Sequence, residues 1–175
     1  MKSVNELYIR LQAELAQQKH PPVGLWQPER SGEIDIRIDR DGIWSHEGRR
    51  INRAGLVRVF ASILRKDAEG YFLVTPAERL RIAVADVPFV VVDVDAQGTG
   101  EAQSLLLTTN VGDLVELDAA HELQMREGQP YVRVRDDLFA RVNRATYYRL
   151  VEYGNEEAGN WIVPSCGARF SMGAV

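Results

Sequence analysis

The stretch Arg50-Ile51-Asn52-Arg53-Ala54 opens an apolar run with helical spacing, and nearly the same residues return later in the chain. The second copy reads Arg141-Val142-Asn143-Arg144-Ala145, an offset of 141 − 50 = 91 residues. Each predicted helix is followed by a predicted strand that begins with glycine, Gly70-Tyr71-Phe72-Leu73-Val74 and then Gly159-Asn160-Trp161-Ile162-Val163. A duplicated strand–helix–strand unit is the simplest explanation of this repetition.

Length and composition limit both the architecture and the partners. A chain of 175 residues accommodates one ordinary domain or two small ones. The net charge of −4 gives no overall attraction to a nucleic acid polymer or to an anionic membrane. The longest apolar run, 87–92, is too short to span a bilayer, so no membrane span is expected. A single cysteine, Cys166, and the lack of a signal-peptide pattern favour the reducing cytoplasm.

Three segments are expected. Residues 1–22 form an N-terminal helix and arm, because Ser3 and Glu6 have capping-box spacing and apolar residues then recur at helical intervals before Pro21. Residues 23–86 form a first strand–helix–strand domain, and residues 87–175 form a second, related domain. The expected fold class is α+β, with two tandem small domains from an internal duplication, each a curved antiparallel sheet packed by one helix.

Alternating and helical patterns place the elements of the first domain. Strict alternation over 33–39 predicts a half-buried strand, and an Asp-Gly turn returns the chain in an antiparallel strand that carries Trp44 and His46. Asn52 stands at the expected N-cap of the helix, whose apolar stripe extends from Leu56 to Leu64. A polar turn over 66–70 and strands over 71–75 and 79–84 follow.

The second domain contains more strands before its helix. The nearly continuous apolar run 88–95 predicts a buried strand, and 104–109 is expected to pair back against it. Three further strands are expected over 114–118, 122–126 and 131–135, all before the second helix. The last strands, 161–163 and 168–172, close this domain as the first was closed.

A set of short motifs resembles the bacterial domain-of-unknown-function family 1285. The match extends from about residue 24 to 173 and is specific as a set. It rests on Gly42-Ile43-Trp44, Ile51 with Arg53, Leu73-Val74-Thr75-Pro76 with Glu78, Pro88-Phe89, Thr109-Asn110, Pro130-Tyr131-Val132, and Gly167 with Phe170.

The resemblance implies a two-domain α+β protein built by duplication, with a second domain loosely similar to pleckstrin-homology folds. It also implies a small-molecule site at the domain interface, a nucleotide-like ligand and a role in signalling. The chain departs from the family near its C-terminus, where Ser165-Cys166-Gly167 replaces the usual Ser-Gly-Gly. A ligand contact at that turn is therefore in question.

Arginines flank the start of both predicted helices. A helix N-terminus carries partial positive charge, so Arg53 and Arg144 at the first helical positions are unfavourable unless an anion is near. With Arg50 and Arg141 on the entering strands, each helix start gathers donors suited to a phosphate or a carboxylate. The alternative is a structural ion pair between the domains, with Asp86, Asp93 or Asp118 as the acid, and this alternative is somewhat favoured.

Two further groups of residues are candidates for ligand contact. Tyr131, Arg133 and Arg135 alternate along one predicted strand and can present an aromatic platform with two cations to a nucleotide, although a solvated strand face is the more common arrangement. Thr75 and Glu78 place a hydroxyl and a carboxylate at a strand break, and the same residues also suit an ordinary turn.

Catalytic motifs are absent from the sequence, which has no Walker loop, dinucleotide glycine fingerprint, Gly-x-Ser-x-Gly elbow or His-Glu-x-x-His. A hydrolase using Cys166 or His46 is kept as an alternative, although a packed or turn cysteine is several times more common than a nucleophile. His20, His46 and His121 lack the close spacing of metal ligands, so no metal and no cofactor are expected.

These observations favour a non-enzymatic cytoplasmic module that binds an anionic, nucleotide-like small molecule in a regulatory role. A protein-interaction adaptor is the third hypothesis. The predicted ligand-binding residues are Arg50, Asn52, Arg53, Thr75, Glu78, Tyr131, Arg133, Arg141, Asn143 and Arg144.

Overall fold

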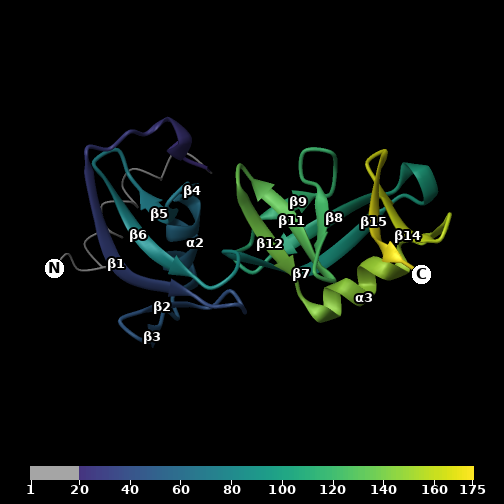
Figure 1. Ribbon diagram of the computed structural model, residues 1–175, viewed down its shortest axis with the longest axis horizontal. Helices are drawn as coiled ribbons and strands as arrows, with labels where there is room; N and C mark the ends of the chain where they lie inside the picture. Colours follow the sequence, from purple (N-terminus) through teal and green to yellow (C-terminus); the bar gives the residue numbers. More distant parts are fainter. Residues whose placement is uncertain (1–19) are drawn as a thin grey trace. The chain divides into compact units, whose positions relative to one another are not determined.

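The computed structural model describes residues 20–175, and the helix expected over residues 4–17 lies outside them (Figure 1). The chain divides into two compact units, the first ending at Asp86 and the second beginning at Val87. Within residues 20–175, each unit contains one six-stranded sheet and one α-helix.

Within residues 20–86, the first unit comprises a short 3-10 helix, six strands and an α-helix. In chain order these are η1 (Val23–Leu25), β1 (Arg30–Ile38), β2 (Trp44–His46), β3 (Arg49–Arg50), α2 (Ala54–Ser62), β4 (Leu64–Asp67), β5 (Gly70–Val74) and β6 (Glu78–Val84). The strand order in the sheet is β3-β2-β1-β6-β5-β4. All neighbours are antiparallel except β1 and β6, whose parallel pairing places the first strand of the unit against its last.

Helix α2 covers one face of this sheet. Ile36 and Ile38 point to that face, as the alternation predicted, and both are fully buried. Trp44 lies opposite Ile38, and its ring stacks on Phe60 of α2 with the ring centroids 6.3 Å apart. Because burial of a large apolar side chain contributes about 1.5–3 kcal/mol, these contacts fix the helix on the sheet.

Within the described residues, the second unit has nine strands, which form two sheets, and one α-helix. In chain order the elements are β7 (Phe89–Gln97), η2 (Gly100–Ala102), β8 (Ser104–Thr109), β9 (Leu114–Glu116), β10 (Leu123–Arg126), β11 (Gln129–Arg135), β12 (Leu138–Val142), α3 (Arg144–Glu152), β13 (Asn155–Glu157), β14 (Asn160–Ser165) and β15 (Ala168–Ala174). The larger sheet has the order β10-β11-β12-β7-β8-β9, with β12 and β7 parallel, and the smaller has the order β13-β14-β15.

The two sheets of the second unit are joined by side chains of β14 and of the segment before β8. Ser165 Oγ accepts a hydrogen bond from the backbone amide of Leu105 at 2.9 Å. The amide of the buried Gln103 donates to the backbone carbonyls of Tyr153 and Pro164 at 3.1 and 2.7 Å. Helix α3 packs against β7.

The internal duplication is visible in the elements that surround each helix. β4 begins at Leu64 and β13 at Asn155, an offset of 155 − 64 = 91 residues. β5 and β6 correspond in the same way to β14 and β15, since 160 − 70 = 90 and 168 − 78 = 90. Before the helix, the antiparallel strands β1-β2-β3 correspond to β10-β11-β12. The repeated segments are therefore 30–84 and about 121–175.

The strands β7, β8 and β9 belong to neither copy. They form an antiparallel meander inserted between the two repeats, and β7 pairs with β12, the counterpart of the edge strand β3. The second unit is thus one repeat with an additional meander rather than a simple copy of the first unit.

Three expectations about local structure are wrong. Each six-stranded sheet is mixed rather than antiparallel, because residues far apart in the chain form one parallel pair. Residues 64–67 form strand β4 and not the end of a helix followed by a polar turn, since Leu64 pairs with Leu73 of β5. Strand β13 had no predicted counterpart.

Candidate functional site

The start of α3 is capped by Asn143. Its side-chain Oδ1 accepts a hydrogen bond from the backbone amide of Thr146 at 2.8 Å, which satisfies one of the free amides of the first turn. Arg144 is the first helical residue and is exposed, with its guanidinium 5.8 Å from the ring centre of Tyr148 and its Nη2 3.3 Å from the Tyr148 hydroxyl. This arginine is held against its own helix.

The start of α2 differs by one residue from its expected position. The N-cap is Arg53, in extended conformation, and it makes no side-chain capping hydrogen bond. The prediction that Asn52 caps this helix is therefore wrong, because the helix begins at Ala54. Arg50 lies on β3, and Arg50, Asn52 and Arg53 are all exposed.

Two of the acids proposed as partners of the flanking arginines pair elsewhere. Asp93 forms an ion pair with Arg149 on the exposed side of α3, and the hydrogen bond from Arg149 holds the pKa of Asp93 below its usual value. Asp118 accepts hydrogen bonds from the backbone amide of His121 at 2.7 Å and faces His121 Nδ1 at 3.0 Å. Both acids therefore have partners within the second unit, and within the described residues neither forms an ion pair with Arg144.

Thr75 and Glu78 form the turn between β5 and β6. Thr75 Oγ1 accepts hydrogen bonds from the backbone amides of Ala77 and Glu78 at 3.2 and 3.1 Å, and the Thr75 amide donates to the Glu78 carbonyl at 2.9 Å. Both residues are buried. The threonine hydroxyl is thus occupied by its own turn, which favours the structural reading of this pair.

Tyr131, Arg133 and Arg141 lie together on one face of the larger sheet of the second unit. Tyr131 on β11 is directly opposite Arg141 on β12, and Arg133 is opposite Phe139. Residues that are opposite one another, or two apart along a strand, point to the same face. The structure therefore brings these three predicted residues together.

Arg135 does not share this face. The register shifts between Arg133 and Arg135, so that Arg135 is opposite Leu138 while Arg133 is opposite Phe139. Successive residues of β12 point to opposite faces, and the expectation of one face with both cations is therefore wrong. Arg135 instead lies 5.3 Å from the ring centre of Phe89 and pairs with Asp113 at 3.3 Å, and burial lowers its pKa.

Arg126, which the sequence reasoning did not select, lies on the edge strand β10 and covers the same face. Its guanidinium is 4.8 Å from the ring centre of Tyr131 and 4.3 Å from that of Phe139. The turn at Gly128 was the available signal, because it folds β10 back on β11 and sets Arg126 opposite Gln129, two residues before Tyr131. The arginine–aromatic cluster consists of Arg126, Tyr131, Arg133, Phe139 and Arg141.

The two rings of this cluster are covered by arginines. Tyr131 and Phe139 are 6% and 9% exposed and pack with Val87, so neither ring offers an open stacking surface. The expectation of an aromatic platform for a base is therefore wrong, because guanidinium groups occupy the ring faces. A guanidinium stacked on a ring keeps its N–H edges available for an anion.

The arginines of the cluster differ in their partners. Arg133 donates to the Asp136 carbonyl at 2.9 Å and pairs with Glu122 and Asp137 at 3.3 and 3.7 Å. For Arg126, the described residues supply a single hydrogen bond, from Nη2 to Gln124 Oε1 at 3.1 Å, and no carboxylate. The two rings thus fix the plane of the Arg126 guanidinium, while most of its N–H groups have no acceptor among the described residues.

Cys166 and the histidines do not assemble a nucleophile with a base. The exposed thiol donates to Ser104 Oγ at 3.5 Å, and Ser104 in turn donates to the Glu116 carboxylate at 2.6 Å. His121 faces Asp118, and His46 lies on β2 in the first unit. Among residues 20–175, no histidine is hydrogen-bonded to the thiol.

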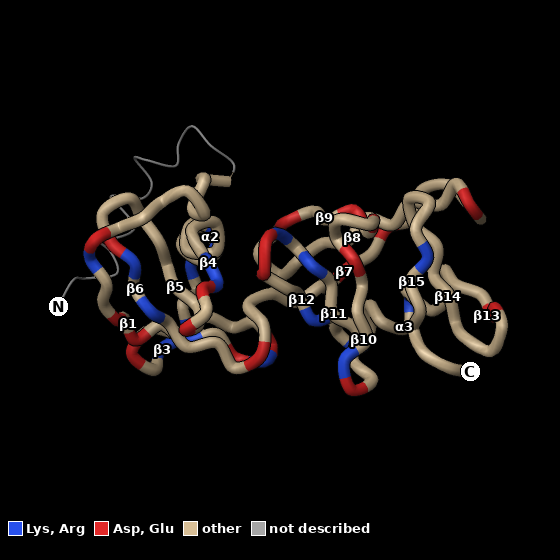
Figure 2. The backbone as a smooth tube through the Cα atoms, turned by 45° about the horizontal axis from the view of Figure 1, so that its top comes forward, with Lys and Arg blue, Asp and Glu red and all other residues tan. Residues whose placement is uncertain are grey.

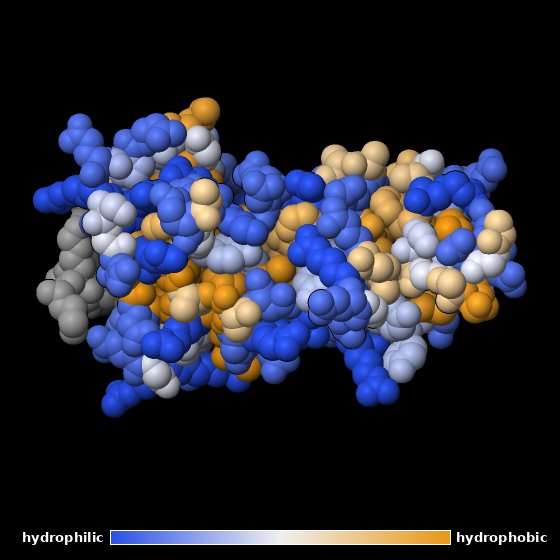
Figure 3. Space-filling view, viewed as in Figure 1, coloured by the Kyte–Doolittle hydropathy of each residue, from blue (hydrophilic) through white to orange (hydrophobic). Residues whose placement is uncertain are grey.

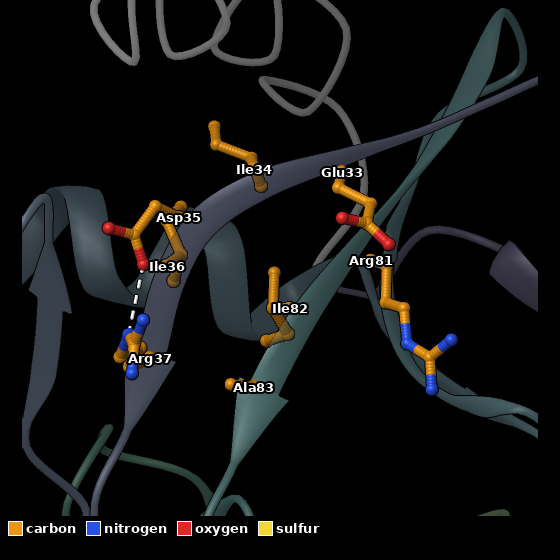
Figure 4. Close-up of a pocket in the computed structure, with 8 residues that line it drawn as sticks. All are labelled: Glu33, Ile34, Asp35, Ile36, Arg37, Arg81, Ile82 and Ala83. Carbon is orange, nitrogen blue, oxygen red and sulfur yellow. Dashed lines mark hydrogen bonds and ion pairs between the residues drawn. The ribbon is translucent and has the colours of Figure 1, made fainter.

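The first unit contains a cavity between β1 and β6 (Figure 4). The parallel ladder pairs Arg30–Glu33 with Glu78–Arg81 and resumes with Arg37 opposite Ala83. Between these stretches, the three residues Ile34–Ile36 face Ile82 alone, so the strands separate. The resulting space of about 450 Å³ is lined by Glu33, Ile34, Asp35, Ile36, Arg37, Arg81, Ile82 and Ala83. We call it the β1–β6 opening.

The surface carries charges of both signs. Figure 2 shows basic and acidic residues interspersed along each unit, in keeping with the net charge of −4. In the part of the chain that the structure describes, no group of three or more His, Cys, Asp or Glu residues is placed to hold a metal ion. None of the helices described there has the length and apolarity that a bilayer span requires.

Comparison with protein-family models matches the chain in two adjoining parts. Residues 21–87 match the N-terminal domain of the domain of unknown function DUF1285, and residues 88–172 match the C-terminal domain of the same family. A search of curated proteins finds no match.

Two solved structures are similar over most of their length. A DUF1285 family protein from Silicibacter pomeroyi DSS-3 has 38% sequence identity and a TM-score of 0.84, covering 94% of this chain and 95% of that one. A DUF1285 family protein from Shewanella baltica OS155 has 28% identity and a TM-score of 0.59, covering 68% of this chain and 91% of that one. The chain belongs to the DUF1285 family.

Proposed function

We propose that this protein is a non-enzymatic regulatory module of the cytoplasm that binds a small anionic molecule, nucleotide-like in its phosphate group, at the arginine–aromatic cluster. The observation that carries the proposal is the position of Arg126. Its guanidinium is stacked on Tyr131 and Phe139, and the described residues provide it with no carboxylate.

A stacked arginine is a suitable anion receptor for a physical reason. Arginine loses side-chain freedom when it binds a ligand, and a side chain already held against two rings loses less. The planar group can then offer two parallel N–H donors to a phosphate or carboxylate. Hydrogen bonds to charged groups contribute about 1.5–3 kcal/mol each, so the loss of this arginine is expected to weaken binding roughly tenfold or more.

In this proposal the cluster binds the anionic part of the ligand rather than its base. Both rings are covered, so a base has no open ring face here, whereas Arg126 adds a positive charge on the same face. Arg133 is neutralised by Glu122 and Asp137 and serves mainly to support Phe139, at 5.1 Å from its ring centre. Affinity should therefore follow ligand charge.

The test is thermal unfolding of the full chain with pyrophosphate, ADP and AMP, and with adenosine as the uncharged probe. A ligand at 100 times its Kd stabilises the native state by about 2.7 kcal/mol, which raises Tm by roughly 5–10 °C for a chain of this size. We expect stabilisation in the order of ligand charge, and no effect of adenosine. Absence of any shift with all three anions at 10 mM would contradict the proposal.

Variants locate the binding. Arg126→Gln should weaken binding of the stabilising anion roughly tenfold. Arg58→Gln is the matched control, because it removes the same charge from an exposed position on α2 in the first unit. Equal losses in the two variants would indicate non-specific attraction and exclude the cluster as the site.

A further inference from the structure

The β1–β6 opening differs in its chemistry from the arginine–aromatic cluster. Figure 4 shows Glu33 and Arg81 at one end of the opening, Asp35 and Arg37 at the other, and Ile82 directed into the space between the strands. Apolar surface is visible among hydrophilic side chains over this part of the first unit (Figure 3). The opening therefore combines an apolar lining with two charged ends.

Backbone polar groups also face the opening. The Asp35 carbonyl accepts from Glu47 on the β2 side, whereas the Ile38 carbonyl accepts from Ala85 on the β6 side. Because successive residues of a strand direct their backbone groups to opposite edges, those of Ile34 and Ile36 face β6. There β6 offers Ile82 alone between the two paired stretches, so this part of β1 has more backbone groups than β6 can pair.

The two charged ends of the opening differ in whether their charged side chains form an ion pair. Asp35 and Arg37 form an ion pair with each other at 2.9 Å. Arg81 donates one N–H to the Glu69 carbonyl at 2.6 Å, and its other N–H groups have no acceptor among the described residues. Glu33 lies opposite Arg81 in the ladder, yet within residues 20–175 it forms no ion pair with Arg81 or with any other cation. One end thus carries a carboxylate and a guanidinium that come from facing positions of the ladder and are not paired with each other.

We infer that the β1–β6 opening binds a small zwitterion of the amino acid or dipeptide class. The ligand's ammonium group is held by Glu33, its carboxylate by Arg81, and its peptide group by the backbone of Ile34 and Ile36. An apolar ligand side chain packs on Ile34 and Ile82. The volume of about 450 Å³ lies within the usual range for small-ligand sites.

The second repeat provides an internal comparison. At the offset of 90 residues that relates β6 to β15, Arg81 corresponds to Ser171 (81 + 90 = 171). The corresponding strands β10 and β15 lie beside each other but form no ladder. The separation of these two strands is therefore common to both repeats, whereas the guanidinium of Arg81 belongs to the first repeat alone.

The test is an NMR titration of the full-length, ¹⁵N-labelled chain with the dipeptide L-alanyl-L-leucine. We expect shifts of the backbone amides of Ile34, Ile36 and Ile82 that saturate with one affinity. N-acetyl-L-alanyl-L-leucine lacks the ammonium group, and L-alanyl-L-leucinamide lacks the carboxylate. Each should bind at least roughly tenfold more weakly, because charge-assisted hydrogen bonds are among the strongest.

Glu33→Gln should weaken binding of the dipeptide at least roughly tenfold, to the level of the acetylated form. Glu156→Gln is the control, since it makes the same change at an exposed position of the second unit. Undisturbed amide shifts at Ile34–Ile36 up to 10 mM dipeptide, equal affinity of the acetylated form, or full affinity in Glu33→Gln would each overturn the inference. Because the anion test reads the second unit, either proposal can fail without the other.

Discussion

Arg65 and Asp67, two residues apart on β4, are joined by two parallel hydrogen bonds, Nε to Oδ1 at 2.7 Å and Nη2 to Oδ2 at 2.9 Å. The remaining nitrogen of Arg65 donates to the backbone carbonyls of Val23 and Trp26, both at 2.9 Å. Arg79 adds a bond to Asp67 at 3.0 Å. One carboxylate therefore orients the arginine that ties the segment before β1 to the sheet, and the hydrogen bond from Arg65 is the main cause that lowers the pKa of Asp67.

This pair makes stability depend on pH. Because the folded-state pKa of Asp67 is lowered from 3.8, its contribution is complete above the unfolded pKa and is lost as pH falls through the folded pKa. Asp67→Asn should cost roughly 2 kcal/mol at pH 7 and should lose less than the wild type between pH 5 and pH 2.5, as measured by urea midpoints. Asp35→Asn, in an ion pair that is largely exposed, should cost under about 1 kcal/mol. Equal effects of both changes would contradict this role of Asp67.

Asn143→Ala should cost about 1 kcal/mol in the free energy of unfolding, because the Thr146 amide at the start of α3 loses its acceptor. The same change at Asn52, one residue before the N-cap of α2, should alter stability by only a few tenths of a kcal/mol. Chemical denaturation of both variants measures the difference. A larger loss at Asn52 would show that this exposed amide has a structural role outside capping.

Gly154→Ala should destabilise the second unit by roughly 1–3 kcal/mol, since overpacking forces neighbours to move. A Cβ atom at this position would lie 2.6 Å from the Ile162 carbonyl oxygen and 2.6 Å from Trp161 Nε1, and that indole donates to the Val151 carbonyl at 2.9 Å. Gly24→Ala meets open space and is the control, with an expected change near zero. Thermal unfolding that shows no difference between the variants would mean that β14 yields at little cost.

Cys166 should react with iodoacetamide at pH 7 no faster than an ordinary free thiol. The thiol is exposed and donates to the Ser104 hydroxyl, and within residues 20–175 no histidine is hydrogen-bonded to it to act as a base. Mass spectrometry of timed samples gives the rate. Labelling that is faster by an order of magnitude or more would revive the hydrolase hypothesis.

Local patterns predicted most strands, and their limits have physical causes. Alternation at Ile34, Ile36 and Ile38 is a property of one strand, so it could be read without the fold. The end of α2 could not be predicted in this way. Ile63 and Leu64 continue the apolar spacing of the helix, but Leu64 belongs to β4, where it pairs with Leu73. The parallel partners of β1 and β7 are distant in sequence and leave no local trace.

The candidate sites were less accessible to sequence reasoning. Tyr131 and Arg133 were found because they alternate, but the side chain that covers both rings, Arg126, comes from another strand. The register shift that removes Arg135 from their face is likewise set by β12. The β1–β6 opening arises from a mismatch between two strands, each of which alone reads as an ordinary strand.

The parallel pairing of β1 with β6 also bears on how the first unit is made. Arg30 lies against Glu78, so a long loop must close before the middle of the sheet exists, and such nonlocal contacts slow folding. During synthesis on the ribosome, β1–β3 and β4–β6 can each form early as hairpins, while the ladder between them waits for Val84 to emerge. Pulsed hydrogen exchange should therefore protect the amides of β5 before those of β1 that face β6.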